Sequence, residues 1–261
     1  MEHFDRLTTL IDRFKLVVRP AAIDAANLIV LKGADGSPKR AQFRTRDLGF
    51  LSQKENYLFS AYVNWGGQQN PLLTALPQTL DIDLSEDPES VGLVKVMQSE
   101  INLQRCGGDA VLSRLGEVLI VRIIRAQIES GAKEPGLLAG LSDPRLSRSI
   151  VAMHDRPGKA WRNDDLAQIA GMSLSRFSEL FLSEVGEPPA AYLRRWRLTL
   201  ARQDIAKGHR VDTVSRRYGF SSPEGFSRAF KKLYGATPID LRNGRTRPAV
   251  TASEQAHGVS G

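Results

Sequence analysis

The stretches FSSPEGFSRAFKKLYGATP (residues 220–238) and GMSLSRFSELFLSEVGEPP (residues 171–189) share one design and decide the fold of the chain's second half. Each begins near a serine that can accept hydrogen bonds from the free amide groups of a helix's first turn. Two phenylalanines follow, four residues apart, and therefore lie on one helical face. A glycine then ends the helix, and a proline comes just beyond it. The sequence predicts two capped helices, each with a buried aromatic face.

The separation of the two stretches indicates a repeated unit. Corresponding residues lie 49 positions apart: Phe177 and Phe226, Phe181 and Phe230, Gly186 and Gly235. A shorter predicted helix precedes each stretch, one capped by Asn163 and the other by Asp212. A short helix, a turn with glycine and a longer capped helix form the helix-turn-helix pattern. We expect two such units, at about 161–186 and 211–235, joined by a long helix at about 189–206.

In a helix-turn-helix unit, the exposed N-terminal residues of the second helix meet base edges in the DNA major groove. The first unit offers Ser173, Ser175, Arg176, Ser178 and Glu179, and the second offers Ser222, Glu224, Gly225, Ser227 and Arg228. Arg194, Lys231 and Lys232 are better placed to contact phosphates, which position the protein without reading sequence. Glu179 could accept from cytosine N4 or remain solvated. For each arginine and lysine, an ordinary solvated role stays open.

The charge of the chain is divided unevenly. Residues 1–140 hold 16 basic and 17 acidic residues, whereas residues 141–261 hold 20 basic and 12 acidic residues. A basic half of this kind favours a polyanion as its partner, and double-stranded DNA fits the helix pattern. Two other classes remain open: a DNA architectural protein with weak sequence preference, and an enzyme with a regulatory DNA-binding tail.

Residues of about 141–242 resemble the DNA-binding domain of AraC/XylS-type transcriptional regulators. The resemblance is carried by AGMSLSRFSELFLSEVGEPPAAYLRRWRL, by the stretch RLTLARQDIAKGHRVDTVSRRYGFSSPEGFSRAFKKLYGATP, and by the closing Thr237-Pro238. It implies a bacterial, sequence-specific regulator whose first recognition helix supplies much of the base reading. The fold expected here is all-α, with two helix-turn-helix units joined by a long helix.

The first half of the chain predicts an α+β domain. Four runs are rich in strand-forming residues and are separated by turn residues: FKLVVR, NLIVLK, AQFRTR and YLFSAYVN. They predict a small antiparallel sheet at about 14–65, followed by a turn-rich connector at 65–78. Two helices should follow, at roughly 89–105 and 109–130. The second helix is apolar around most of its circumference, so it is either buried or meets a partner.

This half resembles the cupin-like sensor domains that precede the AraC-type DNA-binding domain, best in NPLLTALP and VLSRLGEVLIVRIIRAQIESG. A cupin is a double-sheet jelly roll of about eight strands. Because only four strands are predicted, we expect a shortened domain. The predicted organisation is a sensor or dimerisation domain at 1–130, a linker at 131–142, the DNA-binding domain at 143–242 and a disordered tail at 243–261.

Nothing in the sequence indicates catalysis, a metal or a cofactor. Catalytic cupins hold a metal with clustered histidines and carboxylates, but this half has one histidine, His3. Cys106, the single cysteine, is either a thiol sensor beside Arg105 or an ordinary residue at a helix end. Trp65 either lines a ligand pocket or packs on the sheet. The effector-binding residues therefore remain unknown.

The sequence also suggests partners and a location. No stretch is apolar enough to span a membrane, and no secretory signal opens the chain, so we expect a cytoplasmic protein without a membrane partner. Helix 109–130 is the candidate surface for a homodimer, with burial inside the monomer as the alternative. RNA polymerase and an unidentified small-molecule effector are further candidate partners.

Overall fold

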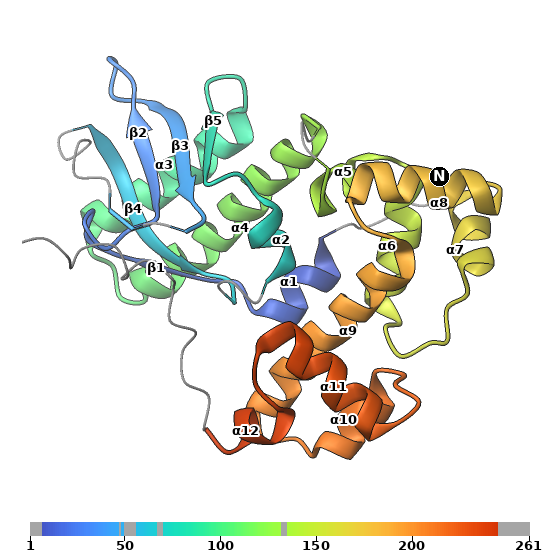
Figure 1. Cartoon of the computed structure of the whole chain (residues 1–261). Coiled ribbons are helices and arrows are strands. Elements are labelled where there is room, and N and C mark those ends of the chain that lie inside the picture. Colours follow the sequence, from blue (N-terminus) through green and yellow to red (C-terminus); the bar gives the residue numbers. More distant parts are fainter. Residues whose placement is uncertain (1–6, 47, 50–55, 67–69, 132–134, 245–261) are drawn as a thin grey trace, which may run out of the picture. The chain divides into compact units, whose positions relative to one another are not determined.

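The computed structural model describes residues 7–46, 48–49, 56–66, 70–131 and 135–244 (Figure 1). The chain forms two compact units. The first holds the described residues up to Arg156 together with Trp161–Leu193, and the second holds Pro157–Ala160 together with the described residues from Arg194 onward. The chain therefore passes between the units more than once.

The first unit contains one antiparallel sheet of five strands: β1 (Val17–Pro20), β2 (Leu28–Lys32), β3 (Pro38–Arg44), β4 (Tyr57–Asn64) and β5 (Thr79–Asp83). The spatial order is β1-β4-β2-β3-β5. All four predicted strands are confirmed, and β5 was missed. In the part of the chain that the structure describes, the cupin-like domain is thus one five-stranded sheet rather than a double-sheet jelly roll.

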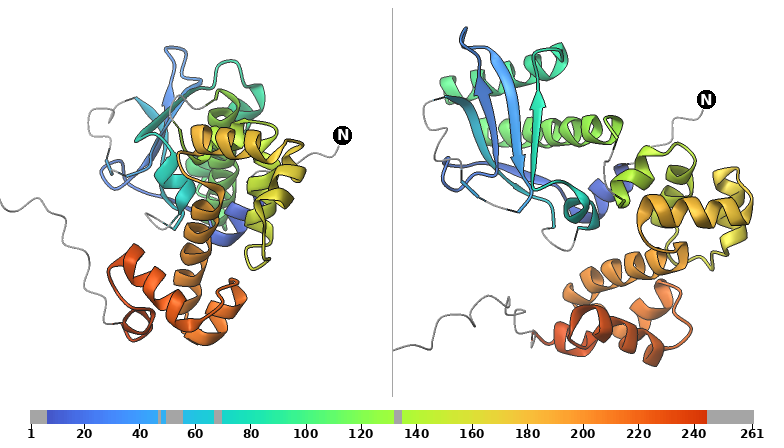
Figure 2. Two further views of the ribbon diagram at one scale, coloured as in Figure 1. Left: turned by 45° about the vertical axis from the view of Figure 1, so that its right-hand side comes forward. Right: turned by 45° about the horizontal axis from the view of Figure 1, so that its top comes forward.

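Five helices accompany this sheet among the described residues: α1 (Thr8–Phe14), α2 (Pro71–Ala75), α3 (Pro88–Leu103), α4 (Gly108–Glu129) and α5 (Leu137–Ser142). The views in Figures 1 and 2 show α3 and α4 along one face of the sheet. The two long helices were predicted to within two residues. The predicted connector at 65–78 and the predicted linker at 131–142 contain helices α2 and α5, which were not predicted, and α5 has five buried residues.

Helix α4 is apolar mainly because the chain itself covers it. Ile120 and Ile124 are fully buried, and Gly116 lies directly against β1. A Cβ at Gly116 would lie 2.5 Å from Cγ1 of Val18, so the glycine allows the helix to approach the strand closely. Val118 remains exposed on the outer side of the helix. Burial in the monomer therefore accounts for the inner face, and the homodimer stays a prediction that concerns the outer face alone.

An ion-pair cluster joins the start of α3 to α4. Arg122 donates from Nη2 to both carboxylate oxygens of Asp87, at 2.7 and 2.9 Å. It also donates to Glu89 at 2.6 Å and to Ser90 Oγ at 2.7 Å. Hydrogen bonds from Arg122 lower the pKa of Asp87 from 3.8 to about 2. One arginine thus holds the N-terminal turn of α3 in place.

We expect Asp87→Asn to lower the free energy of unfolding at neutral pH by about 1 kcal/mol, since solvent screens a carboxylate that is 37% exposed. Because folding lowers this pKa, the carboxylate stabilises the fold above about pH 4 and loses that effect as the pH falls toward 2. The variant should therefore differ less from the parent at about pH 3 than at about pH 7 in urea denaturation. Glu86→Gln, at an exposed neighbour, is the control and should change stability by less than about 0.5 kcal/mol. An equal difference at both pH values would contradict the ion-pair explanation.

The rest of the described chain is helical, as predicted: α6 (Leu146–Asp155), α7 (Asn163–Ala170), α8 (Leu174–Val185), α9 (Pro189–Ala206), α10 (Val211–Arg217), α11 (Pro223–Tyr234) and α12 (Pro238–Arg242). The pair α7–α8 lies in the first compact unit and α10–α11 in the second. Helix α12 was not predicted. The expected tail at 243–261 falls almost wholly outside the described residues, and the domain boundaries stay predictions.

Two predicted helix caps were wrong by one or two positions. Asn163 is the first residue of α7, and Arg162 stands before it, its backbone N–H donating to Asp165 at 3.0 Å. Asp212 lies inside the first turn of α10, which begins at Val211. In both helices an aspartate in the first turn interacts favourably with the positive end of the helix dipole. The sequence therefore predicted the helix starts closely but assigned the cap to a short polar residue that lies inside the first turn.

Candidate nucleic-acid interface

Helix α8 has the structure expected of a first recognition helix. Ser173 Oγ accepts from the backbone N–H of Arg176 at 3.4 Å, which caps the helix as predicted. Phe177 and Phe181 are fully buried, with ring centroids 5.5 Å apart. Gly186 ends the helix with a φ of 82°, a value that favours glycine. The aromatic face fixes which residues of α8 can reach a partner.

Helix α11 repeats this arrangement in the second unit. Ser222 Oγ accepts from the backbone N–H of Gly225 at 3.0 Å, and Pro223 is the first helical residue. Phe226 packs against Phe220 and Phe230, with centroid distances of 5.0 and 5.6 Å. The sequence repeat is therefore a structural repeat of cap, aromatic face and glycine stop. Helical spacing also predicts Leu233 on the face of Phe226 and Phe230, but Leu233 is 42% exposed, so this prediction is wrong.

The structure gives Gly225 a local role. A Cβ at this position would lie 3.1 Å from Ser222 Oγ, closer than ordinary van der Waals contact. A larger residue would therefore crowd the capping hydroxyl. The glycine therefore keeps room beside the cap, a role that the sequence did not predict.

We expect Ser222→Ala to lower the free energy of unfolding by about 1 kcal/mol, because the Gly225 amide would lose its capping partner. Ser173→Ala is the matched variant in α8. Its longer hydrogen bond predicts a smaller loss, below about 1 kcal/mol. Thermal unfolding followed by circular dichroism would measure both losses. A loss for Ser173→Ala that equals or exceeds the loss for Ser222→Ala would contradict this ranking.

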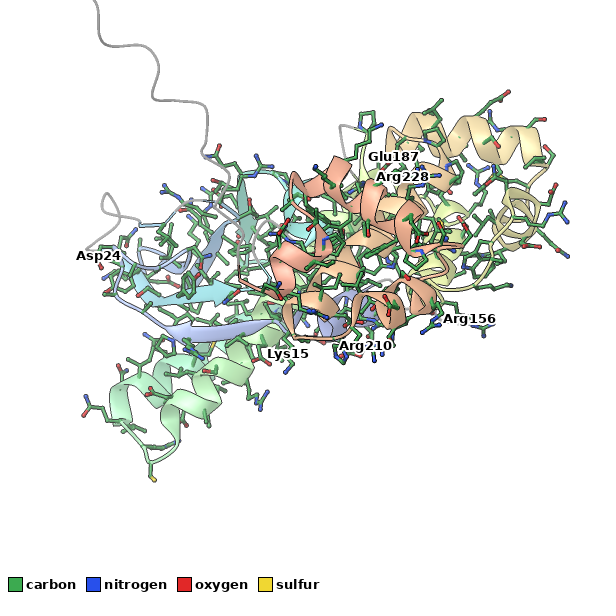
Figure 3. The ribbon with its side chains drawn as sticks, turned by 60° about the horizontal axis from the view of Figure 1, so that its bottom comes forward. Lys15, Asp24, Arg156, Glu187, Arg210 and Arg228 are labelled. Carbon is green, nitrogen blue, oxygen red and sulfur yellow. The ribbon has the colours of Figure 1, made fainter. Side chains whose placement is uncertain are left out.

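The predicted DNA-contact residues divide by exposure. The exposed ones are Ser173, Ser175, Arg176, Glu179, Arg194, Glu224, Arg228, Lys231 and Lys232, whereas Ser178, Ser222, Gly225 and Ser227 are half-buried. Within the described part of the chain, Glu179, Arg228, Lys231 and Lys232 form no ion pair, so their charges are available to a ligand. Figure 3 draws these side chains and labels Arg228 on α11.

Three contacts hold the second helix-turn-helix pair to α9. Asp204 accepts from Arg217 Nη1 at 2.6 Å and from the Tyr218 hydroxyl at 2.8 Å, which ties α10 to α9. Arg202 lies 4.7 Å from the ring centroid of Tyr234 at the end of α11, a cation–π contact. Helices α10 and α11 are therefore both held to α9, and these side chains are engaged inside the second compact unit.

Sequence reasoning missed a junction around Arg197. Its Nε donates to the Pro157 carbonyl at 2.6 Å and its Nη2 to the Lys159 carbonyl at 2.7 Å. Burial lowers the pKa of this guanidinium, and the nearby Arg194 charge adds to the effect. The loop 157–160 thereby becomes part of the second unit. The sequence signal was present, since Arg197 belongs to the motif that carries the resemblance, but a motif does not reveal its contacts.

Other predicted site features can be located in the first unit. Cys106 is exposed in the turn between α3 and α4. Trp65 is buried, and its Nε1 has no hydrogen-bond partner among the described residues. Those residues contain no cluster of histidine, cysteine or acidic side chains suited to a metal ion. None of their helices has the length and apolar character needed to cross a bilayer.

Comparison with known proteins gives two domain matches. The family described as a helix-turn-helix domain matches residues 166–244, and the Cupin family matches residues 17–129. The match to the Cupin family spans β1 to the end of α4. The helix-turn-helix match includes α8 and α11. The helix-turn-helix match begins in the first compact unit and ends in the second, so the two matches do not follow the division into compact units.

Curated relatives are bacterial transcription regulators. The HTH-type transcriptional regulator AlkR of Acinetobacter baylyi is 34% identical over 179 residues, which are 66% of this chain and 58% of AlkR. An uncharacterized HTH-type transcriptional regulator of Haemophilus influenzae is 30% identical over 69% of this chain and 60% of its own length. The solved DNA-binding domain of AdpA, in complex with a target DNA, is 27% identical over 40% of this chain and 93% of that domain, with a TM-score of 0.37. The chain spans about half to three fifths of the length of the curated relatives it matches first.

Proposed function

Since this chain is of the AraC/XylS type, with a cupin domain followed by an AraC-type helix-turn-helix domain, we propose that it is a sequence-specific transcription regulator. Its activity is the binding of double-stranded promoter DNA rather than catalysis. Counterion release supplies much of the affinity, and contacts to base edges supply the sequence preference.

The observation that carries this proposal is the structural repeat. The two proposed recognition helices, α8 and α11, each have a serine cap, a buried aromatic face and an exposed N-terminal turn. Helix α9 joins the two helix-turn-helix units. Helix α9 has 18 residues and is about 27 Å long, close to one turn of DNA at roughly 34 Å. We therefore propose that one chain reads two adjacent segments of the major groove.

The proposed contacts follow exposure and chemistry. Base edges are met by Ser175, Arg176, Ser178 and Glu179 of α8, and by Glu224, Ser227 and Arg228 of α11. Arg194, Lys231 and Lys232 contact phosphates, which set the position of the protein on the duplex. Ser173 and Ser222 cap their helices, and Gly225 keeps space beside a cap, so these three support the contacts rather than select bases.

The remaining partners are proposed from the same regulator role. A second copy of the chain would meet the outer side of α4, where Val111 and Val118 are exposed. RNA polymerase is the proposed target at the promoter, and a small-molecule effector is the proposed ligand of the cupin domain. Because its DNA partner is bacterial promoter DNA, we place the protein in the cytoplasm.

The test is a fluorescence-anisotropy titration of the full chain on DNA from upstream of its own coding region. A scrambled duplex of equal length is the control, and both are titrated at two salt concentrations. We expect the upstream DNA to bind at least about a thousandfold more tightly. Failure to bind either duplex at low salt would overturn the proposal.

Equal binding to both duplexes, weakening steeply with salt, would favour the other candidate, a DNA architectural protein. Such a protein binds through uniform positive charge. The mixed serine, glutamate and arginine surface of α8 is the observation against it, because a carboxylate weakens sequence-independent contact with phosphate.

A further inference from the structure

The two helix-turn-helix units carry opposite charge. Residues 161–186 contain two basic and four acidic residues, a net charge of −2. Residues 211–235 contain five basic and two acidic residues, a net charge of +3. Two units with the same fold, caps and aromatic faces are therefore unequal in the one property that sets attraction to phosphate.

The difference persists on the recognition helices themselves. Helix α11 exposes three cations, Arg228, Lys231 and Lys232, against one carboxylate, Glu224. Helix α8 exposes Arg176 and Glu179, which offset one another. Glu179 lies one helical turn after Ser175, on the side opposite the buried aromatic face. It forms no hydrogen bond or ion pair with the described residues, so its carboxylate is free to meet a ligand.

An exposed carboxylate has two effects in a DNA groove. It is repelled by phosphates, which lowers binding to every sequence. It can also accept a hydrogen bond from the N4 amino group of cytosine, the base-edge group that carboxylates pair with in the major groove. A small neighbour such as Ser175 leaves room for the carboxylate to approach a base. Glu179 therefore disfavours contact unless a cytosine amino group compensates.

We propose that the second helix-turn-helix unit anchors the chain to DNA and that Glu179 in the first unit selects for cytosine at one operator position. This division of labour rests on the regulator function proposed above. It differs from the expectation drawn from the resemblance, in which the first helix supplies much of the base reading through its variable residues in general. In this proposal Glu179 discriminates between bases, and the second helix-turn-helix unit supplies the affinity.

The first arm of the test measures base preference. The full chain and its Glu179→Gln variant each select duplexes from a randomised pool, and the enriched sites are compared. We expect the parent to enrich cytosine at one position and the variant to lose that preference by about 10-fold, with adenine gaining because glutamine pairs with it. Glu184→Gln removes the same charge from α8 at a half-buried position and should leave every preference unchanged.

The second arm measures anchoring through the salt dependence of binding. Replacing both Lys231 and Lys232 with alanine should reduce the slope of log affinity against log salt by up to about 2, since each lost phosphate contact removes about 0.9. Arg176→Ala should reduce the slope by much less than the value of about 0.9 that one phosphate contact gives, because this residue lies in the unit that does not anchor. Lys95→Ala, at an exposed position on α3, controls for loss of charge alone and should not change the slope.

The outcomes separate this inference from the function on which it rests. If the parent chain enriches no sequence and binds no duplex, the regulator function fails and the inference fails with it. If the parent enriches a site and Glu179→Gln enriches the same site, the cytosine assignment alone is overturned. If Arg176→Ala reduces the salt slope by about 0.9, as the loss of one phosphate contact would, the assignment of the anchor to the second unit is overturned.

Discussion

Phe226→Ala should lower the free energy of unfolding of the second unit by about 3–5 kcal/mol, the largest loss we expect from a single truncation here. Phe226 is fully buried and contacts two further aromatic rings, so alanine would leave a cavity that the short helices around it cannot fill. Because this ring packs α11 into the second unit, its loss should also displace the exposed residues of α11 and weaken DNA binding.

Leu233→Ala is the matched control for this prediction. Leu233 belongs to the same helix but is 42% exposed, so its truncation should change the free energy of unfolding by less than about 0.5 kcal/mol. Urea denaturation with circular dichroism gives the global value, and hydrogen exchange of residues 211–242 localises it to the second unit. Equal losses for the two variants would mean that the inner face of α11 is wrongly assigned.

Gly158→Ala should lower the free energy of unfolding by about 3 kcal/mol, because the added methyl group has no room. Its Cβ would lie 2.2 Å from the Arg217 carbonyl oxygen, and backbone cannot turn aside as a flexible side chain can. The loop that bears Gly158 also supplies the carbonyls that bind Arg197. The substitution would therefore displace the loop and break both hydrogen bonds.

The control for this substitution is Gly92→Ala. Gly92 lies within α3, and a Cβ there meets nothing within 4 Å. Alanine should raise the free energy of unfolding by up to about 1 kcal/mol, since it favours the helix more than glycine does. Thermal unfolding would rank the two variants. A stable Gly158→Ala protein with unchanged protection of loop 157–160 against hydrogen exchange would contradict the close contact.

Local signals in the sequence predicted much of this fold. Ser173 and Ser222 were identified as caps because a serine before an apolar helical pattern is a local feature. The buried aromatic pairs followed from helical spacing, which needs no knowledge of the partner that covers them. The exposed residues of the candidate interface followed in turn, as the complement of the buried face.

Features set by distant contacts were not predictable in this way. Strand β5 carries aspartates at two exposed positions and directly follows a turn-rich segment, so its sequence does not indicate a strand. Only its pairing with β3 identifies it. Helix α5 is short and lies in a range that reads as a linker. The contacts of Arg197 join residues 38 and 40 positions apart, and no period in the sequence connects them.

The loop from Pro157 to Ala160 also limits where this chain can be joined to another protein. It belongs to the second unit, yet Trp161–Leu193, which follow it in the chain, belong to the first. A gene fusion joined anywhere in 161–193 would give Arg197 a foreign loop in place of the one whose carbonyls it binds. Transfer of the helix-turn-helix units to another protein should therefore succeed only when the junction lies before Pro157, so that both units are transferred together.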